Sequence, residues 1–233
     1  MEPIIDFFLH PYKNASFFDI ALEATAAFFG ILSVWYAKKE KILVYPTGII
    51  STFLYIFICY RFVLYGDMIV NIYYTLMSIY GWYMWSKVID DAQHHIPISR
   101  TNFNDKLKAI GIFVFTSIFV IVVYRYYNVM PNNLGFSESV NYALENMFSG
   151  DLEKFRSITP FIDTFTTGIF FAAMWLMANK KLENWTLWII GDLASVPLYF
   201  VKGLGFTGIQ YTIFLFLAIQ GYFAWKKSLD NKI

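Results

Sequence analysis

Residues 80–85 read Tyr-Gly-Trp-Tyr-Met-Trp and residues 220–225 read Gln-Gly-Tyr-Phe-Ala-Trp, so the same glycine and the same final tryptophan recur 140 positions apart. The same offset pairs Glu23 with Asp163, each near the start of a long apolar segment. Weak internal similarity of this kind is typical of transporters built from repeats. The chain is therefore predicted to contain two copies of one unit, and this repeat decides the fold.

Seven apolar segments accompany the repeat. A membrane-spanning helix needs about 20 mostly apolar residues, and the sequence predicts such helices at Phe17–Ala37, Ile42–Phe62, Met68–Val88, Leu107–Tyr127, Phe161–Ala178, Leu187–Val201 and Thr207–Trp225. Their continuous apolar runs favour a helical bundle over a barrel. The fourth helix reverses the chain, so that the copies before and after it point the same way. The predicted fold class is an all-α integral membrane protein with seven transmembrane helices in a 3+1+3 parallel-repeat arrangement.

This organisation divides the chain into seven parts. They are an N-terminal interfacial segment (1–16), a first three-helix repeat (17–88), a cytoplasmic linker (89–106), a connecting helix (107–127), an outer loop (128–160), a second three-helix repeat (161–225) and a cytoplasmic tail (226–233). Within the outer loop, Val140–Phe148 has the pattern of a short surface helix. One further repeat match, Glu40 with Glu183, needs an offset of 143 and therefore a small insertion.

The composition argues against most classes of soluble protein. Of the 233 residues, 58% are hydrophobic, 21% aromatic and 15% charged, whereas soluble domains use roughly 25% charged residues. The net charge of +1, without a long Lys/Arg cluster, makes nucleic acid an unexpected partner. The single Cys59 can form no internal disulfide. Met1–Asn14 reaches no small-residue cleavage site, so we expect it to stay on the protein.

Lysine and arginine are distributed unequally between the two sides of the predicted bundle. Counted near the helix ends, 12 fall on the side of the C-terminus and 6 on the side of the N-terminus. Cytoplasmic loops carry the excess of these residues, so the N-terminus is predicted to face outward and the C-terminus the cytoplasm. Aromatic residues near helix ends are typical interfacial anchors, and we interpret in this way Trp35, Tyr36, Trp82, Trp85 and Trp225.

Both repeats contain an interrupted helix at the corresponding place. The second predicted helix carries Pro46 and Gly48, and the sixth carries Gly191 and Pro197. In transporters built from repeats, a pair of Gly/Pro-interrupted helices indicates a binding site near the bilayer midplane. The alternative is that Gly and Pro are simply commoner in membrane helices than in soluble ones.

Asp192 is the sharpest candidate for a binding residue, because a charge inside the bilayer is costly. Trp188 and Trp185 precede it by four and seven residues, so the three share roughly one helical face. An indole beside a carboxylate suits a flat, cationic, hydroxylated ligand. The alternatives are a structural hydrogen bond for Asp192 and an interfacial anchor for Trp185.

Other residues complete the predicted site. Asn71, with Tyr74 one turn on, offers an amide and a phenol, although an interhelical hydrogen bond would also explain the amide. Tyr211 lies in an apolar run where simple packing is the alternative. The predicted substrate-binding set is Trp188, Asp192, Asn71, Trp185, Tyr74, Tyr211 and Ser195.

The remaining ionisable residues give weaker signals. Glu23 and Asp163 could relay protons, but their places near the outer helix ends favour capping or helix contacts. His94 and His95 lie in a polar linker, where a solvated loop is favoured over a metal site. The sequence has no His-Glu-x-x-His, Gly-x-Ser-x-Gly or P-loop pattern. Neither an enzyme activity nor a cofactor is therefore expected.

Three stretches give the chain a family resemblance. They are Glu40-Lys41-Ile42 followed by Tyr45 and Gly48, then Ile79-Tyr80-Gly81-Trp82-Tyr83-Met84-Trp85, then Glu183-Asn184-Trp185-Thr186-Leu187-Trp188. Through them, almost the whole chain resembles the Pnu family of bacterial vitamin transporters. The resemblance implies a fold like that of the SWEET sugar transporters, with two three-helix bundles joined by a fourth helix. It also implies assembly as a homotrimer in the bacterial cytoplasmic (inner) membrane.

The resemblance further implies a function, which is vitamin uptake by facilitated diffusion, with trapping through phosphorylation by a cytoplasmic kinase. The family's contacts to the nucleoside would fall on Trp188, on Asp192 where relatives often have Asn, and on Asn71 where relatives often have Gln. We expect nicotinamide riboside as the substrate, and thiamine is the alternative within the family. A proton-coupled symporter, or a membrane receptor or scaffold that moves nothing, would also agree with the sequence.

Overall fold

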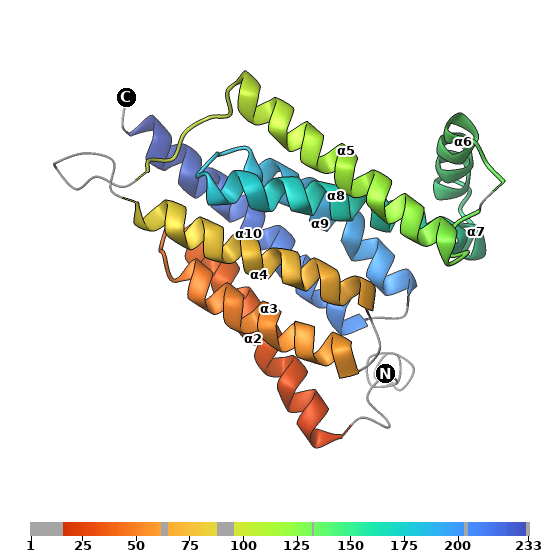
Figure 1. The fold of residues 1–233 in the computed structure, drawn as a ribbon, viewed down its shortest axis with the longest axis horizontal. Helices are drawn as coiled ribbons and strands as arrows, with labels where there is room; N and C mark the ends of the chain where they lie inside the picture. The colour runs from red at the N-terminus through yellow and green to blue at the C-terminus, as the bar shows by residue number, and fades with distance from the viewer. Residues whose placement is uncertain (1–15, 62–64, 88–95, 132, 203–204, 232–233) are drawn as a thin grey trace.

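Helices dominate the computed structural model, which describes residues 16–61, 65–87, 96–131, 133–202 and 205–231 (Figure 1). They are α2 (Phe17–Lys38), α3 (Val44–Arg61), α4 (Tyr65–Ser86), α5 (Phe103–Tyr126), α6 (Phe136–Met147), α7 (Leu152–Ser157), α8 (Thr159–Ala178), α9 (Asn184–Val201) and α10 (Gly205–Asp230). Seven of them overlap the seven predicted segments, and α6 overlaps the predicted surface helix. Most of the predicted N-terminal segment (1–15) and residues 88–95, with His94 and His95, lie outside the described residues.

Polar caps fix where two of the long helices begin. The Ser16 hydroxyl, just before α2, accepts a hydrogen bond from the Asp19 backbone N–H at 3.1 Å. Asn102 and Asp105 form a reciprocal capping box at the start of α5, with bonds of 2.8 and 3.0 Å. Such caps satisfy backbone donors that the first helical turn leaves free. For this reason α5 begins at Phe103, four residues before the apolar run from which its start was predicted.

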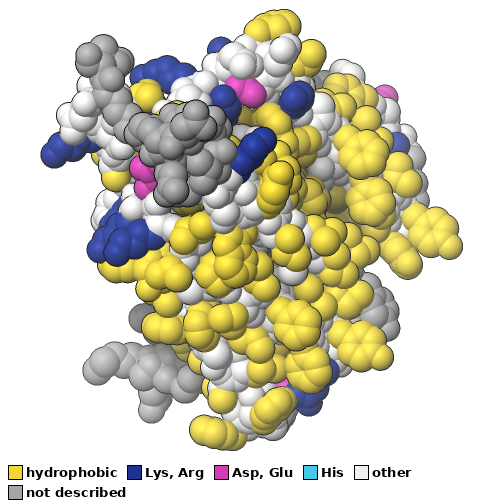
Figure 2. Space-filling view, turned by 60° about the vertical axis from the view of Figure 1, so that its left-hand side comes forward, with side chains coloured by type: hydrophobic (Ala, Val, Ile, Leu, Met, Phe, Trp, Pro, Cys, Tyr) yellow, Lys and Arg dark blue, Asp and Glu magenta, His cyan; other side chains and the backbone are white. Residues whose placement is uncertain are grey.

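The long helices expose more apolar surface than is usual for a soluble protein. Four of them, α2, α5, α8 and α10, are long and apolar enough to cross a membrane. Large hydrophobic side chains such as Phe53, Leu76 and Phe115 are exposed. Figure 2 shows hydrophobic side chains across most of one face, with Lys and Arg gathered mainly toward one end. Soluble monomers rarely expose so wide an apolar patch, so the fold is that of an all-α, multi-pass membrane protein.

The helices contact one another in an order that closes a ring. α2 packs on α3 and α3 on α4, while α8 packs on α9 and α9 on α10. The two groups meet where α4 contacts α8 and where α10 contacts α2. α5 packs on α8 outside this ring, and Figure 1 shows it running along the bundle. At each junction, the third helix of one group therefore meets the first helix of the other.

Both groups reverse direction through turns of the same shape. Glu40, between α2 and α3, has a φ of 55°, and Lys180, between α8 and α9, has a φ of 49°. A positive φ is uncommon outside glycine, and these two residues are 140 positions apart. The structural counterpart of Glu40 is therefore Lys180, so the predicted pairing of Glu40 with Glu183 through an insertion is wrong. We call the end of the bundle with these turns the lysine-rich end, after Lys38, Lys39, Lys41, Lys180 and Lys181.

Candidate functional site

Asp192 lies on α9 and is only 2% exposed. Among the described residues, its carboxylate forms no ion pair with a lysine or an arginine. Two phenols from other helices, Tyr74 of α4 and Tyr211 of α10, lie close enough to interact electrostatically with this carboxylate. A buried carboxylate without a counter-charge is costly. The arrangement is therefore suited to a cationic or hydroxylated ligand that binds reversibly.

Aromatic rings from three helices stack near this carboxylate. Trp188 of α9 stacks on Phe170 of α8, with ring centroids 5.2 Å apart and planes at 27°. Phe170 lies 5.9 Å from Tyr211 of α10, and Tyr211 stacks on Tyr199 of α9 at 4.7 Å. Trp188 and Asp192 are one turn apart on the same face of α9. The site thus holds an indole and a carboxylate together, and Phe170, which the sequence did not indicate, backs the indole.

Gly191 makes room for Phe170. A Cβ atom at position 191 would lie 2.2 Å from Phe170 Cε1, closer than two carbon atoms can approach. The counterparts in the first repeat, at the offset of 140, are Ser51 for Gly191 and Gly30 for Phe170. In the first repeat, the glycine is therefore on the first helix (Gly30, α2) and the larger residue is on the second helix (Ser51, α3). The close contact between Phe170 and Gly191, and with it the stacked rings beside Asp192, is therefore found in the second repeat and not in the first.

Gly191→Ala should lower the thermal stability of the purified protein, because the added methyl group collides with a ring that is already packed. Overpacking of this kind costs about 1–3 kcal/mol. Phe170→Leu in the same chain removes the colliding ring edge and should restore most of the melting temperature. Gly111→Ala on α5 is the matched control, since a Cβ atom there would have no heavy atom within 4 Å. A Gly191→Ala protein that melts like wild type would contradict the packing.

Trp185 and Ser195, two further residues of the predicted site, are also buried on α9. Trp185 meets Trp225 of α10 edge to face, with ring centroids 5.5 Å apart. An interfacial anchor must reach the headgroup region, so that alternative does not fit the burial of Trp185. Its indole Nε1 has no hydrogen-bond partner within the described ranges. Trp185 lies about one turn closer to the lysine-rich end than Trp188 does.

Asn71 is bonded to its own helix. Its amide Nδ2 donates to the Asp67 carbonyl oxygen on α4 at 2.9 Å, which is not the interhelical bond considered as the alternative. Asn71 and Tyr211 are 140 positions apart and are therefore counterparts on the third helices of the two repeats. On α4 it is Tyr74, one turn further on, that lies within electrostatic range of Asp192.

Ion pairs join helices within each repeat at the end opposite the lysine-rich end. Asp163 of α8 pairs with Lys202 at the end of α9. In the first repeat, Asp19 of α2 pairs with Arg61 at the end of α3. The interpretation of Asp163 as a helix-contact residue is thus confirmed.

Hydrogen bonds between the repeats close the lysine-rich end, and the sequence did not predict them. The indole Nε1 of Trp85 donates to the Met177 carbonyl oxygen at 3.2 Å, and that of Trp225 donates to the Ala37 carbonyl oxygen at 2.9 Å. Donors and acceptors are each 140 positions apart, so the two bonds are symmetry counterparts. Trp85 and Trp225 are buried, with ring centroids 5.9 Å apart. Their interpretation as interfacial anchors is therefore wrong.

An ion pair reinforces the same junction. Lys180 Nζ lies 2.9 Å from Glu40 Oε1, and the side chains are 7% and 28% exposed. The Lys180 ammonium also lies 4.5 Å from the centre of the Trp85 ring, within cation–π range. At the lysine-rich end, these contacts join the two repeats to each other and close that end. At the opposite end, each ion pair joins two helices of the same repeat.

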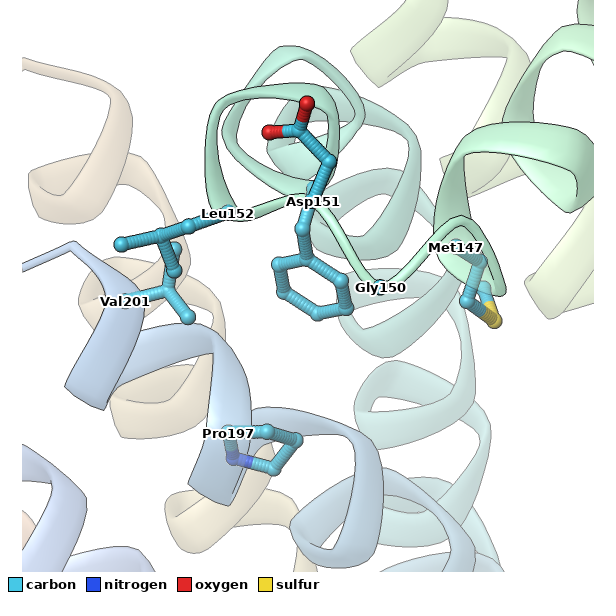
Figure 3. Close-up of a pocket in the computed structure, with 7 residues that line it drawn as sticks. Met147, Gly150, Asp151, Leu152, Pro197 and Val201 are labelled. Atoms are coloured by element: carbon cyan, nitrogen blue, oxygen red, sulfur yellow. The ribbon is translucent and has the colours of Figure 1, made fainter.

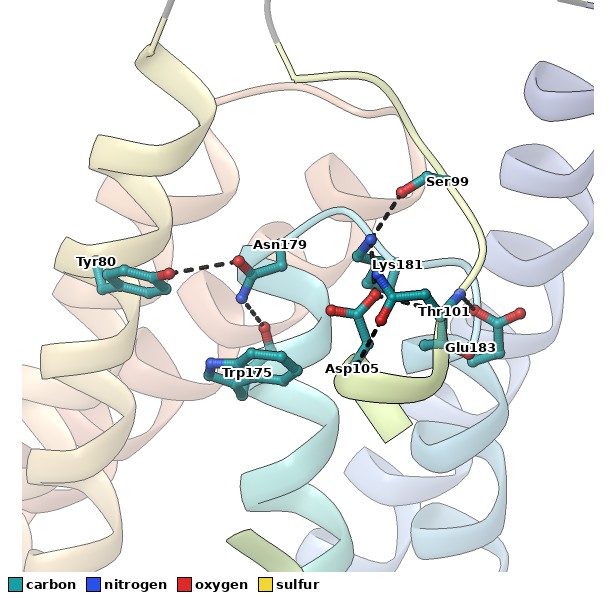
Figure 4. Close-up of polar contacts among 9 residues, drawn as sticks. Tyr80, Ser99, Thr101, Asp105, Trp175, Asn179, Lys181 and Glu183 are labelled. Carbon is teal, nitrogen blue, oxygen red and sulfur yellow. Dashed lines mark hydrogen bonds and ion pairs between the residues drawn. The ribbon is translucent and has the colours of Figure 1, made fainter. Parts of the chain in front are cut away.

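The segment before α5 is fastened to the turn between α8 and α9 (Figure 4). Ser99 and Lys181 form an isolated parallel bridge. Lys181 Nζ pairs with Asp105 at 2.9 Å, and the Thr101 backbone N–H donates to the Glu183 carboxylate at 2.8 Å. Glu183 therefore binds the linker to the second repeat and is not the equivalent of Glu40.

A cavity of about 270 Å³ lies at the opposite end, between the α6–α7 connection and the last turns of α9 (Figure 3). It is mostly apolar and is lined by Met147, Gly150, Asp151, Leu152, Phe155, Pro197 and Val201. Figure 3 shows the Asp151 carboxylate turned away from Pro197. Pro197 follows Asp192 by five residues, which is about 7.5 Å along a helix axis. None of the seven predicted site residues lines this cavity.

Comparisons with known proteins agree with this architecture. A family model described as nicotinamide mononucleotide transporter matches residues 20–227. The chain is 25% identical to the nicotinamide riboside transporter PnuC of Escherichia coli (strain K12), over 96% of this chain and 93% of that protein. It is 28% identical to the protein of the same name from Neisseria mucosa, over 90% and 73%. A crystal structure of the vitamin B3 transporter PnuC matches with a TM-score of 0.61 and 23% identity, over 90% of this chain and 82% of that one, and so shares the fold.

Proposed function

The chain belongs to the nicotinamide mononucleotide transporter family, and from this premise we propose that it is a membrane transporter for the uptake of nicotinamide riboside. The two curated relatives carry that substrate in their names. In this molecule, the observation that carries the proposal is the position of Trp188 and the buried Asp192, one turn apart on one face of α9.

Nicotinamide riboside combines a flat cationic ring with ribose hydroxyl groups, and both parts suit this pair. Trp188 would stack on the pyridinium ring with a cation–π gain. Asp192 would pair with the positive charge or accept hydrogen bonds from hydroxyl groups. Tyr74 and Tyr211 would add phenolic hydroxyl groups beside Asp192, and the proposed site is completed by Trp185, Ser195 and Asn71. The thiazolium of thiamine meets the same requirements, so thiamine is the second candidate.

For the architecture, we propose seven membrane-spanning helices, two repeats of three joined by α5. The closed ring of helix contacts and the paired indole hydrogen bonds support this arrangement. Because the lysine-rich end is tied across the repeats, the site is proposed to open first toward the opposite end. Opening of the lysine-rich end, by rupture of the indole bonds and the ion pair, would then release the vitamin.

Transport is proposed to be passive, with a cytoplasmic kinase trapping the product. Vesicles containing the purified protein should equilibrate radiolabelled nicotinamide riboside and then stop, while empty vesicles take up little. Unlabelled thiamine and riboflavin, added as competitors, test the substrate. Accumulation above the outside concentration under an imposed proton or sodium gradient would instead identify a symporter. Saturable binding without any flux would identify a receptor.

The proposed orientation in the bacterial inner membrane places the lysine-rich end in the cytoplasm. The excess of Lys and Arg at this end supports it. A fluorescent protein fused to the C-terminus should therefore fluoresce. A dark fusion, together with an active alkaline phosphatase fused at the same place, would reverse the topology. Assembly as a homotrimer is an expectation of the family resemblance that native mass spectrometry of the purified protein can test.

A further inference from the structure

Helix α6 has three distinct faces. Phe136, Val140, Leu144 and Met147 recur at helical spacing and form one apolar stripe, which Phe148 extends past the end of the helix. All five side chains are exposed, Phe136 by 82% and Phe148 by 80%. A helix in contact with water would not present such a stripe to it.

The other two faces of α6 account for its contacts with protein and water. Tyr142 packs against the cluster of Ile158 and Leu198, and its hydroxyl donates to Ser157 Oγ at 2.8 Å. This face joins α6 to the bundle. Glu138, Asn141 and Glu145 are exposed on a polar face. Apart from Met147, which also lines the cavity beside α9, the apolar stripe faces neither the bundle nor the polar side, and neither protein nor water accounts for it.

The position of α6 indicates what that occupant is. α6 lies at the end of the bundle where α5 finishes, and in Figure 1 it crosses the direction of α5 steeply. The last turns of α5 carry exposed apolar side chains, Ile118, Val122 and Tyr126, up to that end. The stripe thus begins close to the end of the exposed apolar surface of α5, where this helix would leave the bilayer core. A helix of this kind lies in the plane of the interface with its apolar face about 5–10 Å into the acyl boundary.

We propose that α6 is an interfacial helix that seats its stripe, Phe136 to Phe148, in the leaflet of the bilayer opposite the lysine-rich end. Its sequence contains no Lys or Arg, so apolar burial and not attraction to anionic headgroups holds it there. Through Tyr142, the seated helix fixes α7 and the end of α9 relative to the membrane surface.

Nitroxide labels on single cysteines test this inference independently of transport. Leu144→Cys reports on the stripe and Asn141→Cys on the polar face, both combined with Cys59→Ala to remove the buried native thiol. In phosphatidylcholine vesicles, the label at position 144 should collide several-fold more with oxygen, relative to a water-soluble nickel complex, than the label at 141. The ratio should be unchanged in vesicles with anionic phosphatidylglycerol.

Two different results would overturn the proposal. Equal access of the nickel complex to both labels would mean that α6 stands in water. Exclusion of both collision partners from position 144, with dipolar broadening between labels on neighbouring copies, would mean that a second copy covers the stripe. Val140→Cys, on the same face, guards against a local disturbance at position 144 and must give the same result.

Discussion

Replacement of Trp188 by alanine should raise the dissociation constant for nicotinamide riboside roughly 5- to 150-fold, because the loss of one aromatic stacking partner costs about 1–3 kcal/mol. Phe170 holds the indole in place from α8, so the free protein already presents the ring in a fixed plane. Isothermal titration calorimetry on the purified protein measures the change. Trp82→Ala is the matched control, since Trp82 is exposed on α4. Unchanged affinity in folded Trp188→Ala would place the site elsewhere.

Asp192→Asn separates the two roles of the carboxylate. If Asp192 mainly accepts hydrogen bonds from ribose hydroxyl groups, the amide oxygen still accepts and the loss of affinity should be small. If it pairs with the cationic ring, the loss should approach that of Trp188→Ala. A neutral analogue with a reduced ring distinguishes these roles further, because its binding should not respond to the substitution in the charge-pairing case.

Glu40→Lys should be the most damaging change at the lysine-rich end, because it would place a second ammonium group against Lys180. Loss of one partner from a fully buried pair costs about 3–5 kcal/mol, and since the Glu40 side chain keeps 28% exposure we expect about 2 kcal/mol. The melting temperature of the purified protein measures the loss. Glu145→Lys, the same change at an exposed position on α6, is the control.

The charge-reversed double variant, Glu40→Lys with Lys180→Glu, should recover part of that stability. The ion pair can form again with its polarity exchanged. Recovery stays incomplete because a carboxylate at position 180 would face the Trp85 ring, where the native ammonium makes a cation–π contact. If the double variant is no more stable than Glu40→Lys, the ion pair does not hold this end together.

The sequence predicted the positions of the helices well, because long apolar runs leave few other structures possible in a bilayer. It also predicted the offset of 140 and the shared helical face of Trp188 and Asp192. It could not show which way Trp85 and Trp225 point, since a helix that is apolar on all sides has no pattern that marks its inner face. The wrong pairing of Glu40 with Glu183 arose because the sequence comparison relied on residue type. The true counterpart, Lys180, has the opposite charge, so likeness of residue type led to Glu183 instead.

The pair of Phe170 and Gly191 escaped prediction for another reason. Each residue is ordinary in a membrane helix, and only the distance between them, which would be 2.2 Å to an added Cβ, reveals the dependence of one on the other. Distances between helices arise from packing and do not appear in the local sequence.

The contact between Glu40 and Lys180 has a consequence for how such a molecule could have arisen. Because the two positions are repeat counterparts, a symmetry axis passes between them, and in a dimer of identical three-helix chains each residue there would meet its own copy. Two glutamates or two lysines would then repel each other at the centre of the assembly. The indole bonds carry no such restriction, because their acceptors are backbone carbonyls, which identical chains also possess. Duplication into a single chain therefore permits an ion pair of opposite charges on the axis, which a homodimer of this unit could not form.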